Sequence, residues 1–289
     1  MPGSIFDLRG PDFLFLYTAI GACVLFLARA RMNAGERDDV IARIDLKEPL
    51  TIAYLRGGVT EVLRVAAFSL VDRGLLLFDG RTLCANSKIA ASLVRRPLEK
   101  ALLERLASPT PTRRMLADRA LRVACEGYAQ ALRERSLLAS AKTYAARMPI
   151  FLLGSAILGG IAGIKIIVAL NRGHTNIAFL AIIALICLAI LLDMYRRERT
   201  ARGDRALADL KVLLAGRKAQ SHRVEPGGAS DDALLLAAVY GFGVLPAQSF
   251  PYLVKLFPKG SGSSNSCGSS CGSGCGGGGC GGGCGGCGS

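Results

Sequence analysis

PIFLLGSAILGGIAGIKIIVAL, the stretch from Pro149 to Leu170, has 22 residues and one charge, that of Lys165. A helix needs about 20 consecutive apolar residues to cross the hydrocarbon core of a bilayer, so the stretch predicts a transmembrane helix. Lys165 lies near one end, where its ammonium group can reach the headgroups and anchor the helix. The mean hydropathy of +0.37 and the hydrophobic content of 51% also indicate a membrane protein.

A second uncharged stretch follows after a short connection. TNIAFLAIIALICLAILL runs from Thr175 to Leu192 and predicts another transmembrane helix, which we place at residues 177–194. The connecting residues, 171–176, are too few to form anything but a loop on the outer side. The two spans therefore form a helical hairpin.

Small residues recur at four-residue spacing along the first helix of this hairpin. Ser155, Gly159 and Gly163 form one series, and Ala156 and Gly160 form another. Side chains this small allow two helices in a membrane to approach closely. We therefore expect these residues to lie against a neighbouring helix.

A third apolar stretch, FLFLYTAIGACVLFLA at residues 13–28, lies near the N-terminus. Its 16 residues are short for a span, and a core helix of a soluble domain is the alternative. A cleaved signal peptide fits less well, because Asp7, Arg9 and Asp12 precede the stretch where a basic region is typical. We interpret it as an uncleaved transmembrane anchor.

Basic residues mark the same end of all three stretches. Arg29 and Arg31 follow the first, Arg147 precedes the second, and Arg196 and Arg197 follow the third. Because Lys and Arg are enriched in cytoplasmic segments beside membrane spans, we predict that residues 1–12 lie outside and residues 29–148 in the cytoplasm. Arg196 and Arg197 are expected to anchor the third span at anionic headgroups.

The cytoplasmic segment has the pattern of a duplicated winged helix-turn-helix. Residues 49–56 and 59–73 read as helices separated by Gly57-Gly58, and an Asp79-Gly80 pair between two apolar runs predicts a β-hairpin. A related order follows, with helices at 97–106 and 113–135 around SPTPT. SLVDRGLL at 69–76 aligns with ALRERSLL at 131–138, although the second copy lacks a convincing wing.

A winged helix raises the question of DNA binding. The second helix of the first copy would present Thr60, Glu61, Arg64 and Ser69, which are poor equipment for reading bases in a major groove. The second copy offers a basic contact surface that suits phosphates, anionic headgroups or an acidic protein. Its residues are Arg113, Arg114, Arg119 and Arg122. Because the domain is tethered near the membrane, we favour a protein or lipid partner over nucleic acid.

The segment from 195 to 259 begins with a basic amphipathic helix. Leu207, Leu210, Leu213 and Leu214 fall on one side of it, which predicts docking on the domain or on the membrane surface. Residues 233–257 are apolar but interrupted by glycine and proline. This pattern favours a short buried helix over a fourth span, which would move the C-terminal tail to the outer side.

The tail at 260–289 consists of Gly, Ser, one Asn and six cysteines, so it has no apolar group to stabilise a fold and is predicted to be disordered. Its cysteines suit Zn²⁺ or Cu(I), although disulfide formation, covalent modification and a tail without any ligand remain alternatives. They are Cys267, Cys271, Cys275, Cys280, Cys284 and Cys287.

Several parts together carry a resemblance to a known family. They are DLRGPDFLFLY at the N-terminus, AYLRGG at 53–58, LVDRGLL at 70–76, the membrane hairpin and the Gly/Cys tail. In this order they resemble a family of uncharacterised bacterial membrane proteins. The resemblance implies a protein of the bacterial inner membrane and carries no catalytic residues over to this chain.

Motifs for catalysis are missing from the sequence. The two histidines, His174 and His222, have no second ligand at metal-binding spacing, and the chain has no nucleophile elbow or Walker lysine loop. We therefore predict a non-enzymatic, mainly α-helical membrane scaffold or partner-recruiting protein. A membrane-tethered winged-helix DNA-binding regulator is the alternative.

Overall fold

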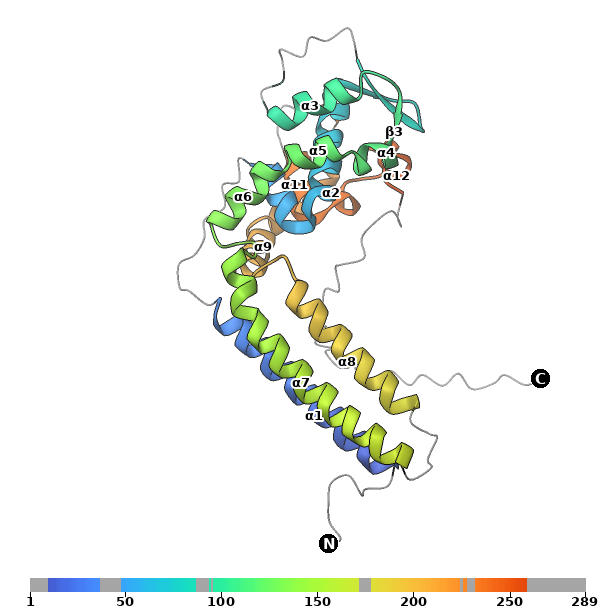
Figure 1. The fold of residues 1–289 in the computed structure, drawn as a ribbon. Coiled ribbons are helices and arrows are strands. Elements are labelled where there is room, and N and C mark those ends of the chain that lie inside the picture. The colour runs from blue at the N-terminus through green and yellow to red at the C-terminus, as the bar shows by residue number, and fades with distance from the viewer. Residues whose placement is uncertain are drawn as a thin grey trace, which may run out of the picture.

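Three long apolar helices form one end of the molecule, and a helical domain with a small sheet forms the other (Figure 1). This computed structural model describes residues 10–36, 48–86, 94, 96–171, 178–223, 226–227 and 232–258. The long helices are α1 (Gly10–Ala34), α7 (Ala141–Asn171) and α8 (Ala178–Arg196). Each is long and apolar enough to cross a membrane, which confirms the prediction that the three apolar stretches form helices of that length.

The helix α7 begins eight residues before the predicted span. Ser140 and Thr143 explain this start, because each side-chain oxygen lies within hydrogen-bonding distance of the other residue's backbone N–H, at 3.4 and 3.3 Å. Such reciprocal bonds satisfy the N–H groups at a helix start. With 31 residues, α7 is about 46 Å long at 1.5 Å per residue, which exceeds the roughly 30 Å hydrocarbon core. It therefore extends beyond the bilayer.

The three helices pack around Tyr17, which is fully buried and donates a hydrogen bond to the Leu158 carbonyl at 3.0 Å. A Cβ atom on Gly154 would lie 2.9 Å from a methyl carbon of Leu191, and one on Gly21 would lie 3.1 Å from the sulfur of Cys187. These two glycines allow the close approach of the helices.

The predicted packing of Gly159, Gly160 and Gly163 against a neighbouring helix is not made with the described residues of α1 or α8. A Cβ atom on any of them would meet nothing within 4 Å among the described residues. The buried face of α7 instead runs through Gly154, Leu158 and Ala162, which share one side because they are four residues apart. Small residues in the sequence thus identify an interface only when the register of the helix is known.

The domain begins with α2 (Pro49–Asp72), which is kinked at Gly57 and Gly58 as predicted. Gly58 has a φ of 66°, a conformation that glycine adopts without strain. The predicted hairpin is also present, as β1 (Leu76–Phe78) and β2 (Thr82–Ala85) in antiparallel pairing. Asp79 closes its turn by accepting hydrogen bonds from the N–H groups of Arg81 and Thr82, which lower the pKa of its carboxyl.

After α3 (Pro97–Arg105), the chain adds β3 (Thr110–Pro111) to the hairpin, in the order β1-β2-β3. The predicted single helix at 113–135 is wrong: it is divided into α4 (Thr112–Ala117), α5 (Arg119–Ala124) and α6 (Glu126–Glu134). Asp118 makes the first division, because its backbone is extended and its carboxylate accepts hydrogen bonds from the N–H groups of Ala120 and Leu121. No further hairpin follows α6 within the described chain up to α7.

The chain returns to the domain after α8. Here α9 (Ala201–Leu213) and α10 (Ala215–Ala219) are followed by the 3₁₀ turn η3 (Ser221–Arg223). Leu207, Leu210 and Leu214 are buried in the domain core, so α9 docks on the domain. Leu213, predicted for the same face, is 71% exposed, because it lies off the i, i+3, i+7 series of the other three.

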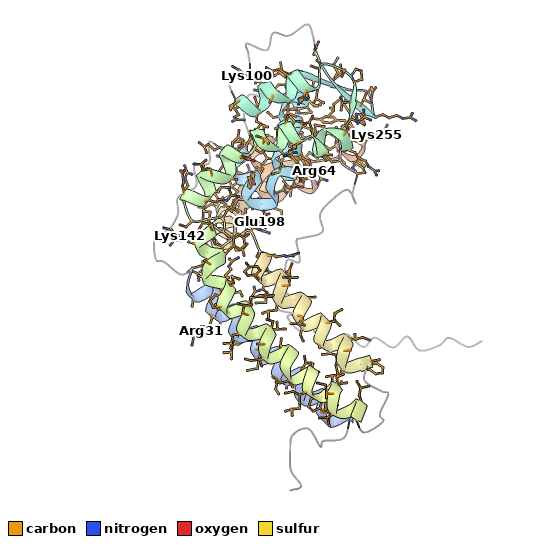
Figure 2. All side chains as sticks on the ribbon, in the orientation of Figure 1. Arg31, Arg64, Lys100, Lys142, Glu198 and Lys255 are labelled. Atoms are coloured by element: carbon orange, nitrogen blue, oxygen red, sulfur yellow. The ribbon has the colours of Figure 1, made fainter. Side chains whose placement is uncertain are left out.

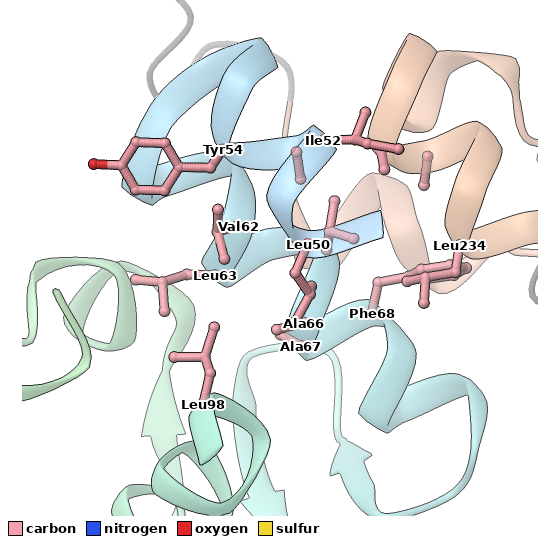
Figure 3. Packing of buried hydrophobic residues seen from close by; sticks show 14 of the residues in the cluster. Leu50, Ile52, Tyr54, Val62, Leu63, Ala66, Ala67, Phe68, Leu98 and Leu234 are labelled. Atoms are coloured by element: carbon pink, nitrogen blue, oxygen red, sulfur yellow. The ribbon is translucent and has the colours of Figure 1, made fainter. Parts of the chain in front are cut away.

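Residues 232–258 complete the core. They form α11 (Asp232–Tyr240), η4 (Phe242–Val244) and α12 (Tyr252–Leu256). Nine residues make α11 about 14 Å long, too short to cross a bilayer. It packs along α2, and Figure 3 shows Leu234 of α11 beside Phe68 of α2. The domain is therefore built from two stretches of sequence, 48–138 and 201–258, with the membrane hairpin inserted between them.

Candidate functional site

The helical bundle and the domain meet at Arg147, which is only 4% exposed. Its Nε and Nη2 donate to Glu36 Oε1 at 2.9 and 2.5 Å, and its Nη1 donates to the Arg197 carbonyl at 2.6 Å. Glu36 follows α1, and its Oε2 accepts a hydrogen bond at 2.6 Å from the N–H of Ala201, the first residue of α9. One buried ion pair therefore joins α1, α7 and the connection between α8 and α9.

Thr200 strengthens this connection from the domain side. Its hydroxyl lies 2.8 Å from the Ser136 carbonyl and accepts the N–H of Gly203 at 3.1 Å, so it caps α9. The backbone N–H of Thr200 donates to the Leu137 carbonyl. A Cβ atom on Gly203 would lie 2.3 Å from that same carbonyl oxygen, so only glycine fits there. We call residues 36, 147 and 197–203, with their contacts at 136–139, the junction.

In the sequence alone, Arg147 is one of several positive charges beside a predicted span. The missed signal is a carboxylate, Glu36, just beyond the first apolar helix and an arginine just before the second. Both helix ends lie on the same side in the predicted topology, so an ion pair between them could have been anticipated. Its burial could not, because that depends on Ala201 and Thr200 far along the chain.

An open groove lies between α1 and α7, next to the junction and on the side of the three long helices, with a volume of about 780 Å³. Leu27 of α1 and Leu153 of α7 form part of its apolar wall and are 55% and 65% exposed. Arg31 and Lys142 stand at its domain end, and Figure 2 shows both on the same edge of the bundle. We call this cavity the α1–α7 groove.

The basic contact surface predicted from the sequence is exposed, but two helices share it. Arg113 and Arg114 lie on α4, whereas Arg119 and Arg122 lie on α5. Within the described residues none of the four makes an ion pair. Met115 and Leu121 are buried on the opposite faces and fix both helices to the core.

The predicted membrane anchors lie at opposite ends of the bundle. Lys165 is on α7 far from the domain, and its Nζ lies 4.4 Å from the centre of the Phe13 ring, a cation–π contact with α1. Arg196 and Arg197 are exposed where α8 ends beside the junction. Arg197 Nε lies 3.9 Å from Asp193, one turn earlier on α8.

The helix that would read DNA is buried. Arg64 and Ser69 are only 8% and 7% exposed, and α3, α6 and α11 all pack against α2. Glu61 is paired with both Arg56 and Arg64 at the kink of α2. A helix enclosed in this way cannot enter a major groove, so the arrangement does not favour the DNA-binding alternative.

Cys125 is a buried cysteine of the domain core. Burial raises the pKa of the Cys125 thiol to about 12, so it stays protonated and a weak nucleophile at neutral pH. Among the residues that the structure describes, no three His, Cys, Asp or Glu side chains are grouped to hold a metal ion. The six tail cysteines, Cys267, Cys271, Cys275, Cys280, Cys284 and Cys287, lie outside the described residues.

Comparison with protein-family models, with curated proteins and with solved structures finds no match to this chain.

Proposed function

We propose that this protein is a non-enzymatic membrane scaffold that holds a basic helical surface at a fixed position beside the bilayer and recruits an acidic protein partner with it. The junction is the observation that carries the proposal. Burying Glu36 and Arg147 costs desolvation free energy that a flexible tether would avoid. Such a joint is useful where the orientation of the domain relative to the membrane matters.

The charge of the domain supports a protein partner. Two helices that the core holds in place carry the four arginines, Arg113, Arg114, Arg119 and Arg122. Binding a partner therefore costs little conformational freedom beyond that of the arginine side chains themselves. A cluster of cations that form no ion pair with any described residue attracts and orients an acidic surface. Figure 1 shows α4 and α5 on the domain, away from the axis of the three long helices.

The location of the protein, its orientation in the membrane and its winged-helix-like unit are part of the same proposal. We place the protein in the bacterial inner membrane with its domain in the cytoplasm, supported by the basic residues at one end of all three spans. The order helix, kink, helix and hairpin at 49–85 supports a winged-helix-like unit. Residues 97–138 do not repeat its hairpin, so the duplication and the family membership rest on the sequence motifs alone.

A photoreactive residue at Val123 tests the recruitment. Val123 lies beside Arg122 and is 53% exposed, so a substitution there is expected to leave the fold intact. On irradiation of intact cells, we expect a discrete protein cross-link that disappears when all four arginines are replaced by glutamate. The control position is Lys100 on α3, which is exposed elsewhere on the domain (Figure 2). Cross-links to lipid alone, or a protein cross-link that survives the charge reversal, would contradict the proposal.

We further propose that the tail cysteines bind a soft metal or are modified. Thiolates suit Zn²⁺ and Cu(I), and metal binding could itself order the tail at 260–289, whose other residues are Gly, Ser and one Asn. The expected result is that purified full-length protein binds more Zn²⁺ or Cu(I) per chain than protein lacking residues 260–289. Equal binding by the two proteins would exclude the metal, and intact mass would then show whether the cysteines carry a modification.

A further inference from the structure

The α1–α7 groove changes in character along its length. At membrane depth its wall is apolar and includes Val24, Leu27, Ile150, Leu153 and Ile157. At the domain end it carries Arg31 and Lys142, both exposed. The cavity thus has an apolar part and a cationic rim, and its volume of about 780 Å³ lies within the usual range for small-molecule sites.

Arg31 and Lys142 are the two cations of the rim. Within the described chain neither Arg31 nor Lys142 has an ion pair. Arg147 also lines the groove, but Glu36 neutralises it and the Arg197 carbonyl occupies its Nη1. The groove therefore carries a net charge of two positive units from Arg31 and Lys142.

The rim lies at the height of the headgroups. Lys142 is the second residue of α7 and precedes the apolar stretch that begins at Pro149 by seven residues, or about 10 Å of helix. Arg31 lies in the last turn of α1, beyond its apolar run. Cations between helices at this depth are typical of sites for anionic lipid headgroups.

We propose that the α1–α7 groove is a binding site for an anionic phospholipid, whose acyl chains lie along Leu27, Leu153 and Ile157 and whose phosphate contacts Arg31 and Lys142. A transmembrane helix of another protein would cover the apolar wall but leave both cations without a partner. A zwitterionic lipid would bring a phosphate together with its own cation, which would repel the rim. The charge of the groove therefore selects a lipid with net negative charge.

The lack of tryptophan in this chain makes the site easy to probe. A Leu153→Trp variant of the full-length protein is placed in vesicles, and its fluorescence is quenched with brominated phosphatidylglycerol or brominated phosphatidylcholine at equal mole fraction. Each cation near the surface contributes about 1 kcal/mol, so we expect an apparent preference for phosphatidylglycerol between about fivefold, if one cation acts, and about thirtyfold, if both act fully. Leu185→Trp on α8, 71% exposed to the surroundings and outside the groove, is expected to show a ratio near one.

Charge variants then separate a site from general attraction to the membrane. Arg31→Gln combined with Lys142→Gln is expected to remove the preference seen at position 153, whereas Arg31→Lys combined with Lys142→Arg retains it. Arg29→Gln is the matched control, because Arg29 is exposed on α1 but does not line the groove. The proposal is overturned if both tryptophans report the same ratio, or if the double glutamine variant keeps the preference. Either result leaves the recruitment by α4 and α5 untouched.

Discussion

Replacing Arg147 with methionine is expected to destabilise the protein by about 3–5 kcal/mol, because the carboxylate of Glu36 would remain buried without a counter-ion. The carbonyl of Arg197 would also lose its donor. For a chain of this size each kcal/mol lowers the melting temperature by about 2–4 °C, so a fall of roughly 10 °C in detergent is the expected result. Amide exchange at Ala201, whose N–H is bonded to Glu36, should become faster in the same variant.

A second substitution identifies the cause. Adding Glu36→Gln to Arg147→Met removes the unpaired charge, so the double variant should be more stable than Arg147→Met alone. Arg135→Met is the matched control, because Arg135 is exposed, precedes Ser136 of the junction and makes no ion pair in the described chain. If Arg147→Met melted like Arg135→Met, the junction would not be the rigid joint on which the scaffold proposal depends.

Gly203→Ala is expected to destabilise the junction by about 1–3 kcal/mol, the usual cost of overpacking. The added methyl would lie 2.3 Å from the Leu137 carbonyl oxygen and 3.1 Å from a methyl of Leu55, and a backbone atom cannot move aside as a side chain can. The hydrogen bond from Thr200 N–H to Leu137 would be disturbed at the same time. Thermal unfolding of the full-length protein in detergent measures the effect.

Gly216→Ala in the neighbouring helix α10 is expected to stabilise the protein, whereas Gly203→Ala destabilises it. A Cβ atom on Gly216 meets nothing within 4 Å among the described residues, so only the helix propensity changes there. Alanine is favoured over glycine in helices by about 0.5–1 kcal/mol, so this variant should be slightly more stable than the unmodified protein. If Gly203→Ala and Gly216→Ala had the same melting temperature, α9 would not be packed tightly against residues 136–139.

The elements predicted correctly depend on local patterns. Apolar composition over about 20 residues predicts a membrane-spanning helix without reference to the rest of the chain, and Ala178–Arg196 is long and apolar enough to be one. Gly57-Gly58 and Asp79-Gly80 likewise carry their own backbone preferences. Asp118 carries one as well, because aspartate is a preferred helix cap, and weighing it would have divided the predicted helix at 113–135.

The rest depends on contacts between distant parts of the chain. The sequence does not show that Gly154 and Gly21, and not Gly159 or Gly163, lie between helices, because this follows from the rotation of α7 about its axis. Nor does it show that Glu36, Arg147 and Ala201 converge, since each belongs to a different segment. The junction and the α1–α7 groove are both products of this convergence and become visible only in three dimensions.

The insertion of the membrane hairpin into the domain has a consequence for biosynthesis. The buried face of α2 is covered by α11, which is synthesised about 160 residues later. At about 5–20 residues per second, α2 waits roughly 10–30 s for its partner, and α7 and α8 emerge in the meantime. The two helices can meet only if the hairpin has entered the bilayer with both ends on the same side. A chain with one of these spans left out of the membrane or inverted would keep an open apolar surface, and quality-control proteases could remove it before it accumulates.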